Sequence, residues 1–183
     1  MKKIIVSVLG YDRPGIIAAV SRILFENRCN IEDVSQTILQ TEFAGIFVAS
    51  VPDELSEESL VESLKQSLTP MGLSVLLKPM EARGEWSSPE SEPFVITTLG
   101  PDRLGLVAGI TGLLARFSVN IAGLKAVFRG GDNPRANVMI YEVDIPVTID
   151  QHVFREALQE RGRELGLEVS VQHRDVFEAI HRV

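Results

Sequence analysis

Two nearly identical stretches, LGYDRPGI at residues 9–16 and LGPDRLGL at residues 99–106, decide how this chain of 183 residues folds. Each stretch follows a β-branched apolar run and precedes a run whose apolar residues recur at helical spacing. A strand that ends in a glycine-containing turn and leads into a helix is therefore predicted twice, ninety residues apart.

The repeat continues beyond the turn, which indicates two copies of one fold. Residues that are identical at an offset of 90 are Leu9, Gly10, Asp12, Arg13, Gly15, Ala18, Leu24, Asn30 and Ile31, matched by Leu99, Gly100, Asp102, Arg103, Gly105, Ala108, Leu114, Asn120 and Ile121. Further along, Val51-Pro52 corresponds to Ile145-Pro146, and there the offset is 94. The four additional residues are expected within residues 129–137, a stretch rich in turn-forming residues.

Each copy shows the pattern strand–helix–strand–strand–helix–strand, which predicts an α+β fold. We expect two tandem ferredoxin-like (βαββαβ) domains, each a four-stranded antiparallel sheet with two helices on one face. The domains are predicted at residues 1–80 and 93–183, joined by a linker at 81–92 that contains Trp86. Within the second helices, Ser56 is expected to be an N-cap, and Gly72 and Gly166 are expected to be left-handed C-caps.

Composition and charge exclude several classes of protein. The net charge is −7, and neither half is basic: residues 1–90 carry 8 basic and 13 acidic side chains, and residues 91–183 carry 10 and 12. Direct binding to nucleic acid is therefore not expected. No apolar stretch approaches the roughly 20 residues of a membrane span. The single cysteine, Cys29, allows no intrachain disulfide and favours a reducing, cytoplasmic location.

The turns lack the motifs of nucleotide-binding loops. Their glycines have the G-x-x-x-x-G spacing of a phosphate-binding loop, but Ile16-Ile17 and Leu106-Val107 follow where lysine and serine or threonine are required. The dinucleotide fingerprint G-x-G-x-x-G is absent as well. The sequence therefore predicts neither a nucleoside triphosphatase nor a dinucleotide-dependent enzyme.

Catalytic and metal-binding patterns are also missing, so we predict no enzyme activity, no catalytic residue, no cofactor and no metal site. The three histidines, His152, His173 and His181, form no H-x-x-x-H pattern. Alternation in the final strand explains His173 and Asp175 better than a metal site does. Cys29 is expected to be a small buried residue near the end of the first helix.

A small carboxylate is the ligand that best suits the repeated turn. A strand-to-helix turn presents unpaired backbone N–H groups at the positive end of the helix dipole, and glycine permits close approach. A free amino acid could place its carboxylate there. Asn30 and Asn120 lie about 21 Å away at the far end of the first helix, so each could meet only the turn of another domain.

Purely structural interpretations of the same residues remain open at this point. Asp12 and Asp102 could be helix N-caps, and the glycines could serve only a tight turn. Asn30 and Asn120 could adopt left-handed backbone angles after a helix. Arg13 and Arg103 could pair with a carboxylate or could be solvated surface charges.

The D-R-x-G turn and the later Asn-Ile pair resemble the ACT domain family, whose ferredoxin-like modules bind amino acids and regulate other proteins. The resemblance covers nearly the whole chain as two tandem copies, and it is strongest toward the glycine cleavage system transcriptional repressor family. Ligand sites of ACT domains lie between paired domains. The resemblance implies ligand-binding residues at Gly10, Asp12, Arg13, Pro14, Gly15, Ile16, Asn30, Ile31, Gly100, Asp102, Arg103, Leu104, Gly105, Leu106, Asn120 and Ile121.

The resemblance implies a non-enzymatic regulatory protein that binds a small, glycine-like amino acid and controls a partner protein, a transcriptional regulator. The alternative is a regulatory subunit that docks on an amino-acid biosynthetic enzyme, as the small subunit of acetolactate synthase does. Leu104 replaces the proline found at Pro14, so the two sites could differ in affinity or one could be vestigial. Domains could pair within one chain or in a homo-oligomer.

Overall fold

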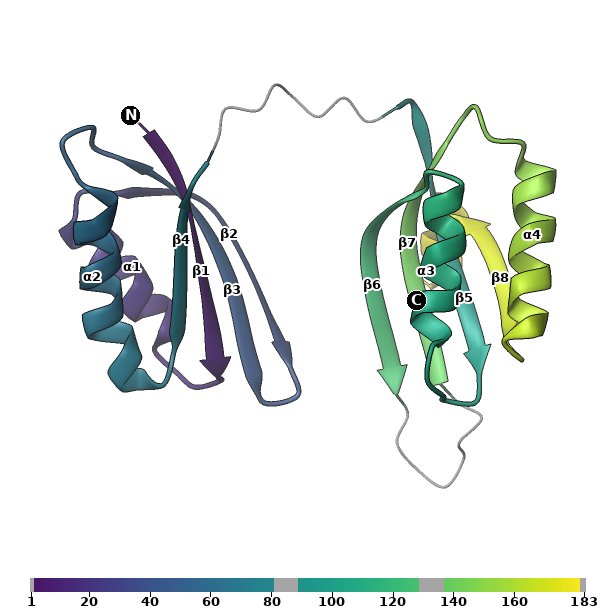
Figure 1. Cartoon of the computed structure of the whole chain (residues 1–183), viewed down its shortest axis with the longest axis horizontal. Coiled ribbons are helices and arrows are strands. Elements are labelled where there is room, and N and C mark those ends of the chain that lie inside the picture. The colour runs from purple at the N-terminus through teal and green to yellow at the C-terminus, as the bar shows by residue number, and fades with distance from the viewer. Residues whose placement is uncertain (1, 81–88, 129–136, 182–183) are drawn as a thin grey trace. The chain divides into compact units, whose positions relative to one another are not determined.

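The computed structural model describes residues 2–80, 89–128 and 137–181. The chain separates into two units, Met1–Glu85 (unit 1) and Trp86–Val183 (unit 2), which are described one at a time below (Figure 1). Residues 81–88 of the predicted linker, Trp86 among them, lie outside the described residues, and the first strand of unit 2 begins at Ser91.

Unit 1 has the predicted order of elements. They are β1 (Lys2–Tyr11), α1 (Ile16–Glu26), β2 (Asn30–Leu39), β3 (Glu42–Val51), α2 (Glu57–Leu68), a one-turn 3-10 helix (Thr69–Met71) and β4 (Ser74–Pro79). The antiparallel sheet has the strand order β2-β3-β1-β4. Alternate residues of β1 pack under the two helices, with Ile4, Val6 and Val8 in the buried core, so one face of the sheet is covered.

Unit 2 repeats this topology and adds one helix. Its elements are β5 (Ser91–Gly100), α3 (Leu106–Arg116), β6 (Asn120–Phe128), β7 (Asn137–Pro146), α4 (Gln151–Glu164), β8 (Glu168–His173) and α5 (Arg174–His181). The strand order is β6-β7-β5-β8, again antiparallel. Asn30 pairs with Ser50, 20 residues later, whereas Asn120 pairs with Asp144, 24 residues later, so the hairpin of unit 2 is four residues longer. The stretch 129–137, where these four residues are predicted, lies outside the described residues except for Asn137.

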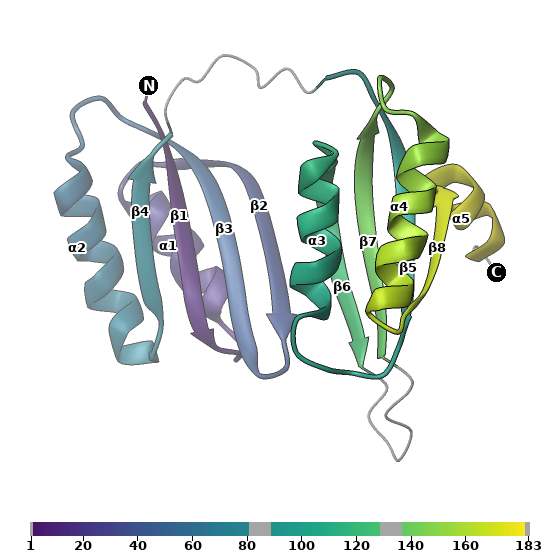
Figure 2. The ribbon, with the colours of Figure 1, turned by 45° about the vertical axis from the view of Figure 1, so that its right-hand side comes forward.

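Helix α5 is an element that the sequence pattern does not predict. It follows β8 directly and packs against β5 and β8, and Figure 2 shows it on the opposite side of the sheet from α4. Val95, on the face of β5 away from the helix-side core, is only 2% exposed. The prediction that strand alternation explains Asp175 is wrong, because the strand ends at His173 and Asp175 lies in the first turn of α5.

The predicted caps of the second helices are confirmed. The Ser56 side chain accepts a hydrogen bond of 3.1 Å from the Ser59 backbone N–H at the start of α2. Gly72 and Gly166 adopt left-handed φ angles of 72° and 62° after the second helix of each unit. The start of α2 and the connections after both second helices therefore form as the local sequence predicts.

The cores of the two units differ at one buried polar group. Tyr141 on β7 is fully buried, and its hydroxyl makes no hydrogen bond within the described residues, although the buried Thr98 hydroxyl lies nearby. The corresponding position in unit 1 is Phe47, which is equally buried. Burial raises the pKa of Tyr141, an effect that Thr98 partly opposes.

Tyr141→Phe is expected to raise the free energy of unfolding of unit 2 by about 1 kcal/mol, because a buried unsatisfied hydroxyl is removed. The raised pKa also means that the wild type loses stability as the pH rises above about 10, where tyrosine ionises in the unfolded chain. Urea unfolding between pH 7 and 11 should show a smaller loss for the variant. Equal or lower stability of Tyr141→Phe at pH 7 would contradict this prediction.

Candidate functional site: the repeated strand-to-helix turn

The turn of unit 1 ends in a helix N-terminus that no side chain caps. The N-cap of α1 is Gly15, with a left-handed φ of 96°, and α3 begins in the same way at Gly105 with a φ of 88°. The interpretation of Asp12 and Asp102 as N-caps is therefore wrong. The first backbone hydrogen bond of α1 runs from the Ala19 N–H to the Gly15 carbonyl at 2.9 Å, so the preceding amides are not used within the helix.

These amides open onto a depression of about 640 Å³ on the surface of unit 1. Its lining residues come from the turn, the first turn of α1, β2 and β3, and they are Asp12, Arg13, Pro14, Gly15, Ile16, Ile17, Ala18, Gln36 and Phe43. Because the Ile16 side chain is buried in the core, this residue offers only its backbone. The depression combines an exposed cation, Arg13, the carboxyl group of Asp12, the amide side chain of Gln36 and N–H groups that α1 does not use, a set that suits the carboxylate and ammonium groups of a free amino acid.

Four of the lining residues were not predicted: Ile17 and Ala18, which continue the first turn of α1, and Gln36 and Phe43, which lie far from the turn in sequence. Gln36 and Phe43 come from the β2–β3 hairpin. They reach the turn because the β2–β3 hairpin folds back beside the end of β1: Phe43 pairs with Gly10 and Gln36 pairs with Gly45. The sequence alone does not predict that Gln36 and Phe43 lie beside the turn, because the length of the hairpin does not determine which of its strands pairs with β1. In unit 2 the equivalent registers place Asn137 opposite Gly100 and Ala126 opposite Met139.

Gly10 and Gly100 lie next to the turn but serve the packing of each unit. A Cβ atom on Gly10 would lie 2.7 Å from the Gly72 carbonyl oxygen, and one on Gly100 would lie 2.9 Å from the Gly166 carbonyl oxygen. Each glycine therefore lets the end of a strand approach the connection that follows the second helix. The first glycine of the repeated motif is explained by folding alone.

Asn30 and Ile31 lie at the opposite end of their own sheet from the turn. Asn30 pairs with Ser50 and Gly10 pairs with Phe43, a separation of seven residues or about 23 Å along β3. Ile31 packs against the core, as Ile121 does in unit 2, and a β-bulge follows each of these isoleucines. As predicted, the asparagine does not reach the turn of its own unit.

The left-handed residues after the first helices are Arg28 and Ser118, with φ angles of 58° and 54°. In unit 1 the Cys29 N–H bonds the Leu24 carbonyl at 2.8 Å, which closes a Schellman motif. The interpretation of Asn30 and Asn120 as left-handed residues is therefore wrong, because both begin strands.

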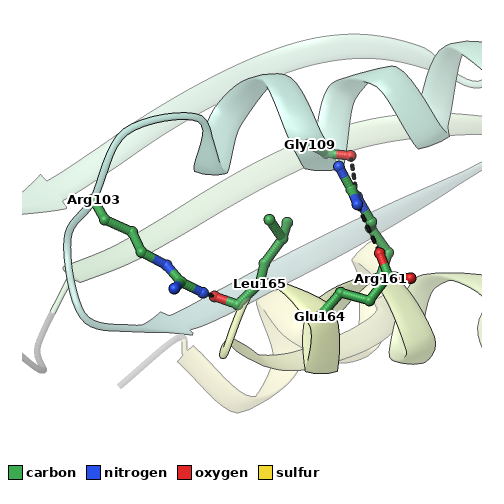
Figure 3. Close-up of polar contacts among 5 residues, drawn as sticks. All are labelled: Arg103, Gly109, Arg161, Glu164 and Leu165. Carbon is green, nitrogen blue, oxygen red and sulfur yellow. Dashed lines mark hydrogen bonds and ion pairs between the residues drawn. The ribbon is translucent and has the colours of Figure 1, made fainter.

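In the turn of unit 2, two side chains form hydrogen bonds with other residues of the same unit. Arg103 Nη2 donates a hydrogen bond to the Leu165 carbonyl at the end of α4, as Figure 3 shows. Asn137 Nδ2 donates to Asp102 Oδ1 at 3.1 Å. Within the described part of the chain, neither Arg13 nor Asp12 has such a side-chain partner. The two copies of the motif thus share a sequence but differ in what their side chains are free to do.

The same difference separates the two asparagines. Asn120 Nδ2 donates to Asp144 Oδ2 at 3.3 Å, whereas Ser50 stands opposite Asn30. No side-chain partner of Asn30 occurs among residues 2–80, 89–128 and 137–181. Leu104 in unit 2 is fully exposed, and its proline counterpart, Pro14, lines the depression of unit 1.

A second depression, of about 580 Å³, lies between α3 and α4 on the helical face of unit 2. Arg161 spans it: its Nε donates to the Gly109 carbonyl at 3.3 Å, and its Nη1 contacts Glu164 Oε2 at 2.6 Å (Figure 3). A Cβ atom on Gly109 would lie 2.7 Å from Leu165 Cδ1, so this glycine allows the two helices to pack closely. None of the predicted binding residues lines this depression.

Cys29 is buried, as predicted, and burial raises the pKa of its thiol, so the reactive thiolate is disfavoured. Among the residues that the structure describes, no three His, Cys, Asp or Glu side chains gather as a metal site would require. Nor does any helix in the described part of the chain have the length and apolar character needed to cross a membrane.

Two βαββαβ units, each with a glycine-bounded turn between the first strand and the first helix, define a tandem of small ferredoxin-like modules. A profile of the ACT domain family matches residues 2–78 and again residues 92–172. The chain therefore belongs to the ACT domain family, whose members are regulatory domains for small ligands.

Two curated relatives match about half of the chain over nearly their whole length. The UPF0237 protein of Methanosarcina acetivorans is 38% identical over 94 residues, which cover 51% of this chain and 98% of that protein. The UPF0237 protein of Methanopyrus kandleri is 42% identical over 90 residues, which cover 49% of this chain and 96% of that protein. Such a relative has the length of about one of the two units.

Two solved structures share the fold over both units. An unknown protein from Galdieria sulphuraria has a TM-score of 0.75 at 23% identity, covering 94% of this chain and 98% of that one. A proposed glycine cleavage system transcriptional repressor has a TM-score of 0.63 at 19% identity, covering 93% and 96% of the two chains. These similarities establish the tandem fold.

Proposed function

We propose that this protein is a non-enzymatic regulator that binds a small, glycine-like amino acid and controls a partner protein, a transcriptional regulator in the cytoplasm. The observation that carries the proposal is the uncapped N-terminus of α1, which opens with Arg13 and Gln36 onto one depression. The family membership supports a small ligand, and the fold shared with a proposed glycine cleavage repressor supports glycine as the first ligand to test.

The turn of unit 1 is the proposed binding site of the two. A carboxylate would accept hydrogen bonds from the free amides of α1 and would pair with the Arg13 guanidinium. Asn30 stands at the far end of its sheet, so it would serve a ligand held by a neighbouring domain. We propose a mainly structural role for the turn of unit 2, since Arg103 and Asp102 already hold partners there. Asn120, at the far end of the same sheet, already holds Asp144.

A thermal-shift screen of the full chain against the twenty common amino acids tests the proposal. Glycine or another small amino acid is expected to raise the melting temperature, since a ligand at 100 times its Kd adds about 2.7 kcal/mol of stability. Glycinamide, which lacks the carboxylate, is the matched control and should produce no shift. If no amino acid raises the melting temperature, the proposed amino-acid binding is wrong, and the remaining proposal is an adaptor that only binds a partner protein.

Affinity purification of the chain from its own cells tests the second part of the proposal. A transcription regulator recovered with the chain, and lost or gained when the amino acid is added, supports control of transcription. Recovery of an amino-acid biosynthetic enzyme instead would favour the alternative of a regulatory subunit.

A further inference from the structure

The sheet of unit 1 has a face that no helix of this unit covers. Strand alternation places on it the residues opposite to the buried core, and three of the large apolar ones are strongly exposed: Leu9 by 54%, Ile46 by 52% and Leu76 by 65%. The register joins them, because Ser7 pairs with both Ile46 and Leu76, and Leu9 pairs with Ala44. We call this surface the open face of unit 1. Exposed apolar side chains on three adjacent strands mark an interaction surface.

One row of the open face carries opposite charges at its two ends. Asp33 pairs with Val48, Val48 with Ile5, and Ile5 with Lys78, so these four residues form a row across the sheet. Asp33 lies on the edge strand β2 and Lys78 lies on the other edge strand, β4, and both are exposed. This row is therefore negative at one edge of the sheet and positive at the other.

We propose that the open face of unit 1 is the interface between two copies of this chain, packed face to face about a two-fold axis parallel to the strands. Such an axis exchanges the two edges of the sheet but keeps each row opposite itself. Lys78 of each copy then stands over Asp33 of the other, which gives two ion pairs. In the next row, Leu76 meets Ser35 and Ile46 meets Ser7, so large side chains oppose small ones, as aligned sheet packing requires.

The equivalent face of unit 2 differs from the open face of unit 1 in two ways: a helix packs on it, and its corresponding row does not carry opposite charges at the two edges of the sheet. Helix α5 packs on its strands, and Val95 is already buried. Its corresponding row runs through Gly123, Glu142, Val95 and Gln172, with no opposite charges at the edges. A chain with one free face of this kind closes as a dimer, whereas two free faces would allow open-ended assembly. The proposal is independent of the proposed ligand.

Sedimentation velocity of the full chain, followed over a range of concentrations, tests the interface. The wild type, of 20.2 kDa, should form a dimer at micromolar concentration. Lys78→Glu and Asp33→Lys should each weaken dimerisation by about tenfold or more, because like charges then face each other. The double variant should restore the dimer. Lys65→Glu, on the exposed surface of α2, makes the same change in charge and should have no effect.

Ile46→Asp provides a second route to the same conclusion, because it places a charge at the centre of the open face and should give a monomer. Thermal unfolding followed by circular dichroism confirms that each variant folds. A wild type that stays monomeric up to about 100 µM, well above the micromolar range of specific complexes, would overturn the proposal. The proposal would also be overturned if the charge reversals left the dimerisation affinity unchanged, or if the folded double variant dimerised as weakly as the single variants.

Discussion

Replacing Gly100 by alanine is expected to destabilise unit 2 by about 2 kcal/mol or more, at the upper end of what overpacking of a well-filled interior costs. The added Cβ atom would lie 2.7 Å from Leu167 Cδ2 and 2.9 Å from the Gly166 carbonyl oxygen. The leucine end can rotate, but the carbonyl belongs to the left-handed connection after α4 and cannot move without disturbing it. Gly10→Ala should destabilise unit 1 for the same reason.

Hydrogen exchange of the full chain, analysed by peptide, measures each unit separately. Gly112→Ala is the matched control, because a Cβ atom at this exposed position of α3 meets nothing within 4 Å. It should stabilise unit 2 by up to about 1 kcal/mol through helix propensity. Normal protection of β5 and β8 in Gly100→Ala would show that the connection yields more easily than its geometry indicates.

The fold could be predicted from the sequence because its local patterns agree with one another. The repeat fixed two copies, the apolar periodicity assigned strands and helices, and Gly72 and Gly166 marked the ends of the second helices. Helix α5 escaped prediction because it follows β8 without a break, so no turn residue separates the two elements.

The site could be predicted only in part. The turn itself is local in sequence, so its residues were found together. Which side chains are free at each turn depends on residues far along the chain, such as Leu165, 62 positions from Arg103, and Asn137, 35 positions from Asp102. Sequence identity between the copies thus hid a difference that only the tertiary structure reveals.

Because Arg13 is free and Arg103 is hydrogen-bonded within the described residues, replacing each of them by alanine is expected to have opposite effects on stability and on ligand binding. Arg13→Ala should leave the stability of unit 1 within about 0.5 kcal/mol of the wild type, since this exposed side chain has no partner among the described residues. It should weaken binding of glycine, the first ligand to be tested, by about 10- to 100-fold, the range of one charge-assisted hydrogen bond.

Arg103→Ala should do the reverse. Its guanidinium bonds the Leu165 carbonyl at the C-terminus of α4, where a cation also faces the negative end of the helix dipole. Loss of this contact should lower the stability of unit 2 by about 1 kcal/mol and leave glycine binding unchanged. Isothermal titration with glycine and urea unfolding measure the two properties. Equal effects of the two variants on binding would mean that both turns hold ligand, and the structural role proposed for the turn of unit 2 would then be wrong.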